Sequence, residues 1–224
     1  MDIASKPPKK GDKGVVMEGR LADWYAKTTG AALAGFEADA RRIATRLPAR
    51  GRVLEIAPGP GYLAIALAKL GDFEIVGLDI SRSFVRIASE NAAKAGVAVE
   101  FTHGDASEMA FPSDKFDFIV CRAAFKNFAD PLGALRETHR VLKPGGEALI
   151  IDLNRNASNA AIDSEVDGMK LGPINSFVTG TILKTMLRRR AYTKADLQRM
   201  AAATPFGKSE IGEASMGLDV WLRK

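Results

Sequence analysis

A short turn rich in glycine and proline is the segment of this chain best suited to hold a ligand. The apolar run 53–56 leads into Ala57-Pro58-Gly59-Pro60-Gly61, and residues 62–70 then show helical spacing. Glycines let a ligand approach the backbone, and the start of a helix offers unpaired N–H groups. The segment 59–64 also matches the G-x-G-x-x-A pattern of dinucleotide-binding turns. The turn therefore predicts a nucleotide-type ligand without saying which one.

Three acidic residues follow, or stand in, successive apolar runs near this turn. Glu55 lies just before the turn, Asp79 ends the next apolar run, and Asp105 follows the one after. A carboxylate in the position of Asp79 suits ribose hydroxyls, so a nicotinamide-dependent enzyme is one interpretation. A carboxylate at Glu55 would attract a cationic amino-acid tail and repel a pyrophosphate. Glu55 therefore favours a different adenosyl ligand.

Alternation of strand-like and helix-like segments predicts the framework that positions these residues. Short connections between them imply parallel strands with helices on both faces of one sheet. We expect Ser83 to cap one helix and Thr193 to open another, with Asp196 completing a capping box. The expected strands are 52–57, 73–78, 98–102, 116–121 and 147–153, the helices are 62–70, 83–94, 131–142 and 193–203, and a C-terminal hairpin is expected over 208–222.

The domain organisation follows from composition along the chain. Residues 1–14 are rich in Lys, Pro and Gly and are predicted to be a flexible basic tail, followed by a single domain over 15–224. Within that domain we expect a helical cap over 15–47, with a break near Gly30 or Gly35. Residues 154–192 form an insertion whose apolar spacing indicates an amphipathic helix. The Arg188–Arg190 run allows a second interpretation, a lid or a surface that faces a membrane or phosphate.

The bulk composition excludes several classes of protein. One cysteine excludes an intramolecular disulfide or a Cys-rich metal site, and two isolated histidines do not indicate a zinc centre. No apolar run is long enough to span a membrane, and the N-terminus lacks the apolar core of a signal peptide. A net charge of +5 permits contact with nucleic acid but gives no strong indication of it. We therefore predict a cytoplasmic protein without a metal.

Several ordered segments resemble the class I S-adenosylmethionine-dependent methyltransferases, in particular the small-molecule branch called type 11. The resemblance is densest over 53–153, and the segments that carry it are 54–61, 76–81, 104–106, 116–120 and 140–146. It implies a Rossmann-like α/β fold, with a mostly parallel seven-stranded sheet and a C-terminal antiparallel hairpin. It also implies S-adenosyl-L-methionine as the cofactor, with S-adenosyl-L-homocysteine as the product.

The resemblance also implies a role for individual positions at the cofactor. The residues it assigns to the cofactor are Tyr25, Glu55, Ala57, Gly59, Gly61, Asp79, Ile80, Asp105, Ala106, Cys121 and Arg122. Glu55 and the turn would line the methionine end, Asp79 would hold the ribose, and Asp105 would accept from the adenine amino group. Ala57 departs from the family, which usually has glycine there, and alanine is acceptable at this position if φ is negative.

The methyl acceptor is less clearly marked. The [Asp/Asn]-Pro-Pro-[Tyr/Phe] sequence of many amino-methylating enzymes is missing, and no dedicated base is evident. Proximity and exclusion of water then suffice for in-line transfer to a small molecule. Expected acceptor contacts are Trp24, Phe125, Lys126 and Asn127. Alternatives are an RNA, protein or phospholipid methyltransferase, a nicotinamide-dependent oxidoreductase, and a non-enzymatic binding protein that keeps the fold.

Overall fold

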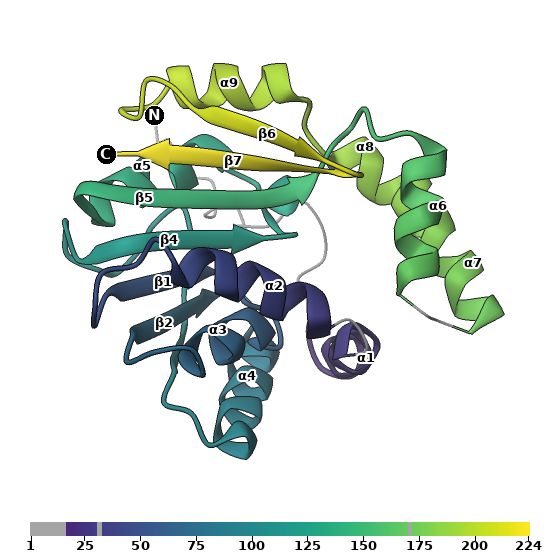
Figure 1. Cartoon of the computed structure of the whole chain (residues 1–224), viewed down its shortest axis with the longest axis horizontal. Coiled ribbons are helices and arrows are strands. Elements are labelled where there is room, and N and C mark those ends of the chain that lie inside the picture. The colour runs from purple at the N-terminus through teal and green to yellow at the C-terminus, as the bar shows by residue number, and fades with distance from the viewer. Residues whose placement is uncertain (1–16, 31–32, 170–171) are drawn as a thin grey trace, which may run out of the picture.

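One seven-stranded sheet runs through the molecule, with the strand order β3-β2-β1-β4-β5-β7-β6 (Figure 1). The computed structural model describes residues 17–30, 33–169 and 172–224, so the predicted tail over 1–14 lies outside the described residues. The first five strands are parallel, and β7 pairs antiparallel with both β5 and β6. The strands are β1 (Arg52–Ile56), β2 (Glu74–Asp79), β3 (Glu100–His103), β4 (Phe116–Arg122), β5 (Leu142–Leu153), β6 (Glu210–Ala214) and β7 (Gly217–Arg223). The predicted fold class, including the C-terminal hairpin, is confirmed.

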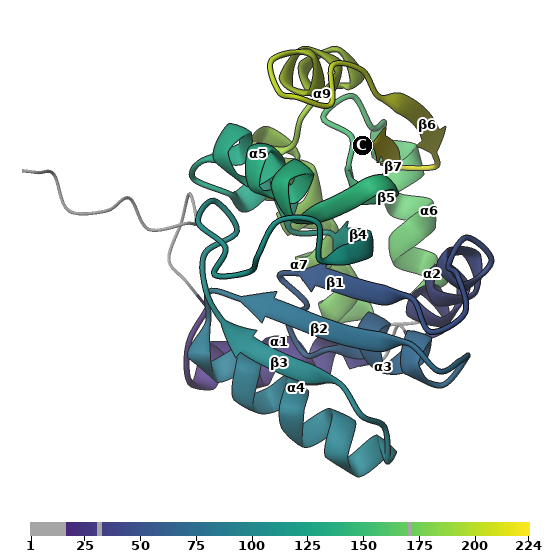
Figure 2. The ribbon, with the colours of Figure 1, turned by 90° about the vertical axis from the view of Figure 1, so that its left-hand side faces the viewer.

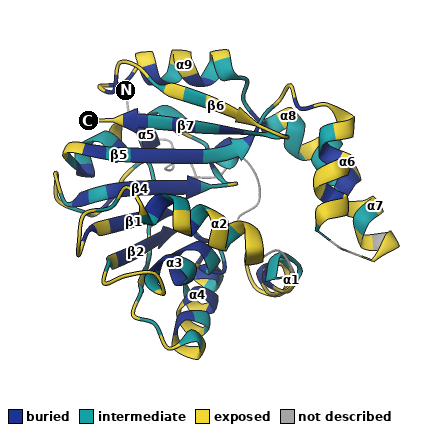
Figure 3. Ribbon diagram, viewed as in Figure 1, coloured by how far each residue is buried: buried dark blue, intermediate teal, exposed yellow. Residues whose placement is uncertain are grey.

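Helices cover both faces of this sheet (Figure 2). On one face lie α2 (Leu33–Ala44), α3 (Tyr62–Ala68) and α4 (Arg82–Ala95), and on the other lie α5 (Pro131–Val141) and α9 (Lys194–Ala202). Successive strand residues alternate between the two faces, so Val53 packs toward α2 and α3 while Leu54 packs toward α5 and α9. Buried residues accordingly fill the central strands, and exposed residues gather on the outer helix surfaces (Figure 3). None of the described helices is long and apolar enough to cross a membrane.

Two helix starts test the predicted capping residues. The expected capping box of α9 is present: the Thr193 side chain accepts from Asp196 N, and Asp196 accepts from Thr193 N. The prediction for α4 is wrong by two residues. Ser81, not Ser83, caps this helix, because its hydroxyl accepts from Phe84 N. Ser83 instead accepts a hydrogen bond from Gly19 N, which lies 64 residues away in the sequence.

The N-terminal cap consists of two helices. After α1 (Arg20–Thr29) the chain breaks at Gly30, as expected, and α2 begins at Leu33. A phenol on α3 joins both helices, since Tyr62 donates to Ala26 O over 2.8 Å and its ring contacts Phe36 edge to face. The cap therefore packs on the first turn of the helix that follows the glycine-rich turn.

The insertion forms a helical arm that extends past the carboxyl ends of the strands (Figure 1). It contains α6 (Asn159–Gly168), α7 (Pro173–Ile182), a π-helical turn η3 (Leu183–Leu187) and α8 (Arg188–Arg190). The predicted amphipathic helix is present, and Leu183 and Leu187 pack against α6. Val178 and Met186, however, are 43% and 48% exposed, because they face away from α6. The expectation that this helix lies on the domain is therefore wrong for α7.

Gly61 is required by packing at the start of α3. It adopts φ +79, and a Cβ there would lie 2.8 Å from Phe101 Cζ and 3.0 Å from Ala88 Cβ. The same phenylalanine ring covers Gly77 on β2. Gly61 therefore sets how closely α3 approaches β3 and α4, which brings the glycine-rich turn down onto the sheet.

We expect Gly61→Ala to lower the free energy of unfolding by about 2–4 kcal/mol, since left-handed strain and overpacking add. Gly96→Ala is the matched control: Gly96 has φ +68 at the end of α4, and nothing lies within 4 Å of its built Cβ. That variant should lose only about 1–2 kcal/mol to the strain. Urea denaturation measures both values, and equal losses would contradict the packing role of Gly61.

Candidate functional site

The carboxyl ends of β1 and β4 meet at the point where the strand order reverses. Strands β2 and β3 lie to one side of this pair and β5 to the other. Ligands of open α/β sheets bind in the crevice at such a point. Two of the four described non-glycine residues with positive φ lie here, Ala57 after β1 and Ala123 after β4. Strained backbone of this kind concentrates at functional sites.

Along the turn, residues with a positive φ alternate with prolines. Positive φ angles of 54°, 54° and 79° occur at Ala57, Gly59 and Gly61, and the intervening residues are prolines. The negative φ that alanine would tolerate at position 57 is therefore not present. Alanine pays about 1–2 kcal/mol in this region because its Cβ crowds the following carbonyl oxygen. The departure from glycine at this position therefore introduces strain into the turn.

The N–H groups of the turn are used within the chain. Ala57 N donates to Leu78 O, Gly59 N to an Asp79 carboxylate oxygen, and Gly61 N to Pro58 O, over 2.8–3.0 Å. Pro58 and Pro60 have no N–H to offer. A pyrophosphate bound to such a turn needs free N–H groups. Residues 57–61 therefore offer no free N–H group to a pyrophosphate, which disfavours a nicotinamide dinucleotide at this turn.

Glu55 is a buried acid directly beneath this turn. Only 3% of the residue is exposed, and its Oε2 accepts from Ala64 N on α3 over 2.9 Å. Burial raises the pKa of Glu55 to about 8, although the Ala64 N–H and the Arg122 charge oppose the rise. A buried carboxyl group of this kind becomes a stable anion when a cation pairs with it. Glu55 is therefore suited to receive a positively charged group of a ligand.

Two more predicted acids lie at neighbouring strand ends. Asp79 is 5% exposed, and its two oxygens accept from Gly59 N and Ser81 N. Asp105 follows β3, and its Oδ1 accepts from the backbone and hydroxyl of Ser107 over 2.8 Å. Gly104 N donates to Asp79 O, so the two segments are joined. Half-buried Ile80 and Ala106 adjoin these acids in the sequence. The structure thus brings the predicted adenosine-side residues together at one edge.

Tyr25 of α1 lies over the glycine-rich turn. A Cβ built at Gly59 would be 4.0 Å from Tyr25 Cε1, and the Tyr25 ring contacts Phe84 edge to face at 5.7 Å. Burial raises the pKa of the Tyr25 hydroxyl, which also feels the charges of Lys126, Arg122, Asp152 and Asp79. These four groups come from the ends of β2, β4 and β5 or from the residues that follow them. The phenol therefore lies where the strand ends converge, whereas Trp24 next to it is 54% exposed.

Arg122 is held in place by α2. Its Nε donates to Asp39 over 2.8 Å, and its guanidinium carbon lies 4.1 Å from the centre of the Phe36 ring. The guanidinium thereby stays close enough to influence Glu55 and Tyr25. Sequence reasoning did not identify Phe36 or Asp39, because no motif marks them on an ordinary amphipathic helix.

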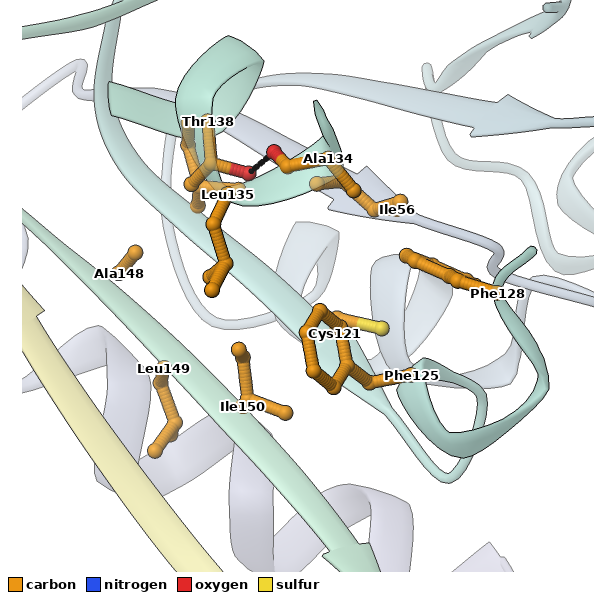
Figure 4. A pocket seen from close by; sticks show the side chains of 11 residues that line it. Ile56, Cys121, Phe125, Phe128, Ala134, Leu135, Thr138, Ala148, Leu149 and Ile150 are labelled. Atoms are coloured by element: carbon orange, nitrogen blue, oxygen red, sulfur yellow. Dashed lines mark hydrogen bonds between the residues drawn. The ribbon is translucent and has the colours of Figure 1, made fainter. Parts of the chain in front are cut away.

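The side chains of Cys121 and Phe125 belong to the core on the far face of the sheet (Figure 4). Burial raises the pKa of the Cys121 thiol, and Phe125 is 2% exposed. The cavity between them and α5 measures about 10 Å³, which is too small for a cofactor. The side chain of Cys121 therefore lies in the core, and the expected acceptor contact by the Phe125 side chain is not supported by its buried position.

Lys126 and Asn127 follow on a 3-10 turn, η2 (Phe125–Asn127). Lys126 Nζ donates to Asp152 over 2.8 Å and to Ala123 O, and both charged side chains are less than 10% exposed. Asp152 also accepts from Lys126 N. Asn127 Oδ1 is buried and has no hydrogen-bond partner among the described residues. Asp152 was not predicted, although an acid at the end of the fifth strand is the signal that identified Asp79.

Comparison with known proteins agrees with this geometry. Residues 54–150 match the model of a methyltransferase domain. A structure of an S-adenosylmethionine-dependent methyltransferase from Methanococcus maripaludis superposes with a TM-score of 0.77 at 25% identity, covering 98% of this chain and 96% of that one. The chain therefore contains a methyltransferase domain over residues 54–150, and it shares its fold with an S-adenosylmethionine-dependent methyltransferase over nearly its full length.

Curated relatives match about half of this chain. An uncharacterized methyltransferase of Bacillus subtilis is 41% identical over 105 residues, which cover 46% of this chain and 41% of the relative. A ubiquinone biosynthesis O-methyltransferase of Ruegeria pomeroyi is 34% identical over 123 residues, covering 54% and 49%. The chain thus spans about half the length of these relatives. The segment that matches the family model, 54–150, contains Glu55, Asp79 and Asp105 but neither the cap nor the arm.

Lys126→Met tests whether the lysine of this methyltransferase is a structural group. Removing one partner of a buried ion pair leaves the other charge uncompensated, so we expect a loss of about 3–5 kcal/mol in the free energy of unfolding. Urea denaturation measures it, with Lys184→Met as control, since Lys184 pairs with the exposed Asp163 on the arm. A loss below about 1 kcal/mol would show that the Lys126–Asp152 pair contributes little to the fold. Lys126 would then again be a candidate for contact with the acceptor.

Glu55→Gln isolates the effect of the buried acid on stability. Because the folded-state pKa is about 8 and the ordinary value 4.5, the folded protein keeps a proton that the unfolded chain releases above pH 4.5. The stability of the methyltransferase then falls as the pH rises from about 4.5 to 8, by on the order of 4 kcal/mol. Glutamine keeps an acceptor for Ala64 N and does not titrate.

The difference in unfolding free energy between Glu55→Gln and the unaltered protein should therefore grow in favour of the variant between pH 5 and pH 8. Denaturant titrations at several pH values measure it, and other titrating groups cancel because both proteins contain them. A constant difference would show that Glu55 is already ionised at pH 5.

Proposed function

We propose that this protein transfers a methyl group from S-adenosylmethionine to a small molecule. The observation that carries the proposal is a buried carboxyl group, Glu55, beneath a turn whose N–H groups are already used. This combination suits a ligand with a cationic amino-acid tail and does not suit a pyrophosphate. The residues around the turn therefore fit S-adenosylmethionine and support the family assignment.

Each binding residue has a role that follows from its position. Glu55 pairs with the ammonium group of the methionine part, and bare Gly59 lets the cofactor approach the backbone. Arg122, held by Asp39, lies near the opposite charge of that tail, its carboxylate. Asp79 accepts from the ribose hydroxyls, Ile80 packs against the adenine, and Asp105 accepts from its amino group. Tyr25 covers the cofactor from the cap.

Methyl transfer requires little from the protein beyond alignment of the methyl donor with the acceptor. When bound, S-adenosylmethionine supplies an activated methyl group on a sulfonium. The chain holds the donor against the turn and excludes water with Tyr25 and α1. At the ends of β4 and β5 the two charged side chains nearest the reaction, Lys126 and Asp152, are paired with each other. Transfer then depends on an acceptor that is already nucleophilic or easily deprotonated.

The acceptor approaches from the end of β4. Asn127 offers a buried oxygen without a partner that can accept from an acceptor hydroxyl or amine, and exposed Trp24 borders the same edge on α1. Because Lys126 is tied to Asp152, we assign the polar contact to Asn127. The name of the Ruegeria pomeroyi relative suggests a hydroxylated quinone precursor as an acceptor to test first.

Calorimetric titration with S-adenosylhomocysteine tests the cofactor assignment. We expect one site with micromolar or tighter affinity, and an affinity lowered about 10- to 100-fold in Asp79→Asn, which loses a charged acceptor for the ribose hydroxyls. The matched control is Asp72→Asn, since Asp72 is an exposed acid paired with Arg50 at the opposite edge of the sheet.

Two results would contradict the proposal. No binding of S-adenosylhomocysteine by the folded protein removes the cofactor, and enhanced fluorescence of NADH on addition of the protein would favour the dinucleotide. Equal affinity in Asp79→Asn and Asp72→Asn would leave the cofactor but place it elsewhere. Because Asp79 also holds Gly59 N and Ser81 N, the circular dichroism spectrum of each variant is compared first.

A further inference from the structure

The segment before α1 is fastened to the first turn of α4. Glu18 uses both carboxylate oxygens there: Oε1 accepts from Arg82 N and Oε2 from Ser83 N, each over 3.0 Å. Two further hydrogen bonds join the same pieces of chain. Ser81 Oγ donates to Met17 O over 2.7 Å, and Gly19 N donates to Ser83 Oγ over 2.9 Å. We call these four hydrogen bonds the Glu18 latch.

The Glu18 carboxylate is well suited to the N–H groups at the start of α4. The first N–H groups of a helix have no partner within the helix, and a negative charge there is favoured by the helix dipole. Ser81 satisfies Phe84 N, and Glu18 satisfies the two N–H groups before it. The hydrogen bonds from Ser83 and Arg82 hold the pKa of Glu18 below its usual range. The carboxylate that closes the latch is thus contributed by a segment far away in the sequence.

Apart from the latch, few contacts hold α1 to the body. Its apolar contact is a cluster of four buried residues, Ala22 and Ala26 on α1 with Phe84 and Ile87 on α4, extended by Met17 and Tyr25. Tyr62 adds one hydrogen bond to Ala26 O, and Arg86 on α4 adds an exposed ion pair with Asp23 on α1 over 3.3 Å. Leu21 and Trp24 on the same helix are 48% and 54% exposed. Four latch hydrogen bonds are therefore a large part of what holds this helix closed.

The position of the latch links it to the cofactor. Helix α4 begins directly after Asp79-Ile80-Ser81, the segment that receives the ribose in the proposed function. At the other end of the same small cluster, Tyr25 lies over Gly59. A cofactor that contacts both Gly59 and Asp79 would therefore lie beside Tyr25 and α1.

We propose that Glu18 is a positioning residue that holds α1 and Tyr25 closed over the cofactor, and so sets the rate at which S-adenosylhomocysteine is released. This inference rests on the proposed function. Glu18 touches neither cofactor nor acceptor. It acts through the position of Tyr25.

Stopped-flow displacement of bound S-adenosylhomocysteine tests the latch. Trp24 on α1 supplies the fluorescence signal, and the only other tryptophan, Trp221, lies on β7. We expect the release rate to rise about 5- to 10-fold in Glu18→Ala, which loses two charge-assisted hydrogen bonds at an exposed site. Glu18→Gln should be intermediate, because it keeps one acceptor oxygen and loses the charge.

Ser89→Gly is the matched control, since exposed Ser89 lies on the same helix and its hydroxyl donates to Val85 O of that helix and not to the cap. Glycine there lowers the stability of α4 without touching the latch. A latch requires the order Glu18→Ala, Glu18→Gln, unaltered protein in release rate, with Ser89→Gly equal to the unaltered protein. A general loss of stability in α4 would instead speed release in Ser89→Gly as well, and this result overturns the latch.

The two proposals fail in different ways. If S-adenosylhomocysteine binds at equilibrium but leaves Glu18→Ala and the unaltered protein at the same rate, the latch is wrong and the proposed function stands. If the unaltered, folded protein does not bind S-adenosylhomocysteine, the proposed function is wrong and the latch is rejected with it.

Discussion

The carboxylate of Asp79 fixes the turn on which the site is built. It accepts from Gly59 N and from Ser81 N, and so it joins the end of β1 to the end of β2. Pro58 and Pro60 cannot donate, so this one acid satisfies the central N–H of the turn. Its second oxygen places Ser81, which starts α4 and thereby sets where Glu18 can bind. Cofactor turn, helix start and cap position thus depend on one buried side chain.

The charged side chains at the site leave Glu55 as the group that would pair with a cation of the ligand. The cationic side chains at the strand ends are already tied to acids from elsewhere, Arg122 to Asp39 and Lys126 to Asp152. Glu55 is buried and forms no ion pair with a described residue, and it keeps its proton near neutral pH at a cost in stability at higher pH. When a cationic tail binds, Glu55 ionises and pairs with it. The strain at Ala57 and the burial of Glu55 are both costs located at the site rather than in the scaffold.

Local patterns predicted most of the fold, because strand–helix alternation and turn residues act over short stretches. The acids at strand ends followed from the same logic, and Asp152 could have been added to them. Other features arise only from contacts distant in sequence. Asp39 reaches Arg122 across 83 residues, and Ser83 serves Gly19 rather than its own helix. Ala57 has a positive φ because the pinned turn outweighs its preference, and Phe125 is buried because Phe128 and Tyr192 pack on it.

The matched domain and the helices around it differ in their surfaces. The methyltransferase model matches residues 54–150, and curated relatives match about half of the chain. The large apolar side chains exposed in the described ranges lie, apart from Leu70, on the cap and the arm: Leu21, Trp24, Leu33, Phe177, Val178 and Met186. These side chains lie outside the matched domain and are not part of the sheet core. Substitutions on the cap and the arm can therefore change the surface beside the strand ends without altering the turn that would hold the cofactor.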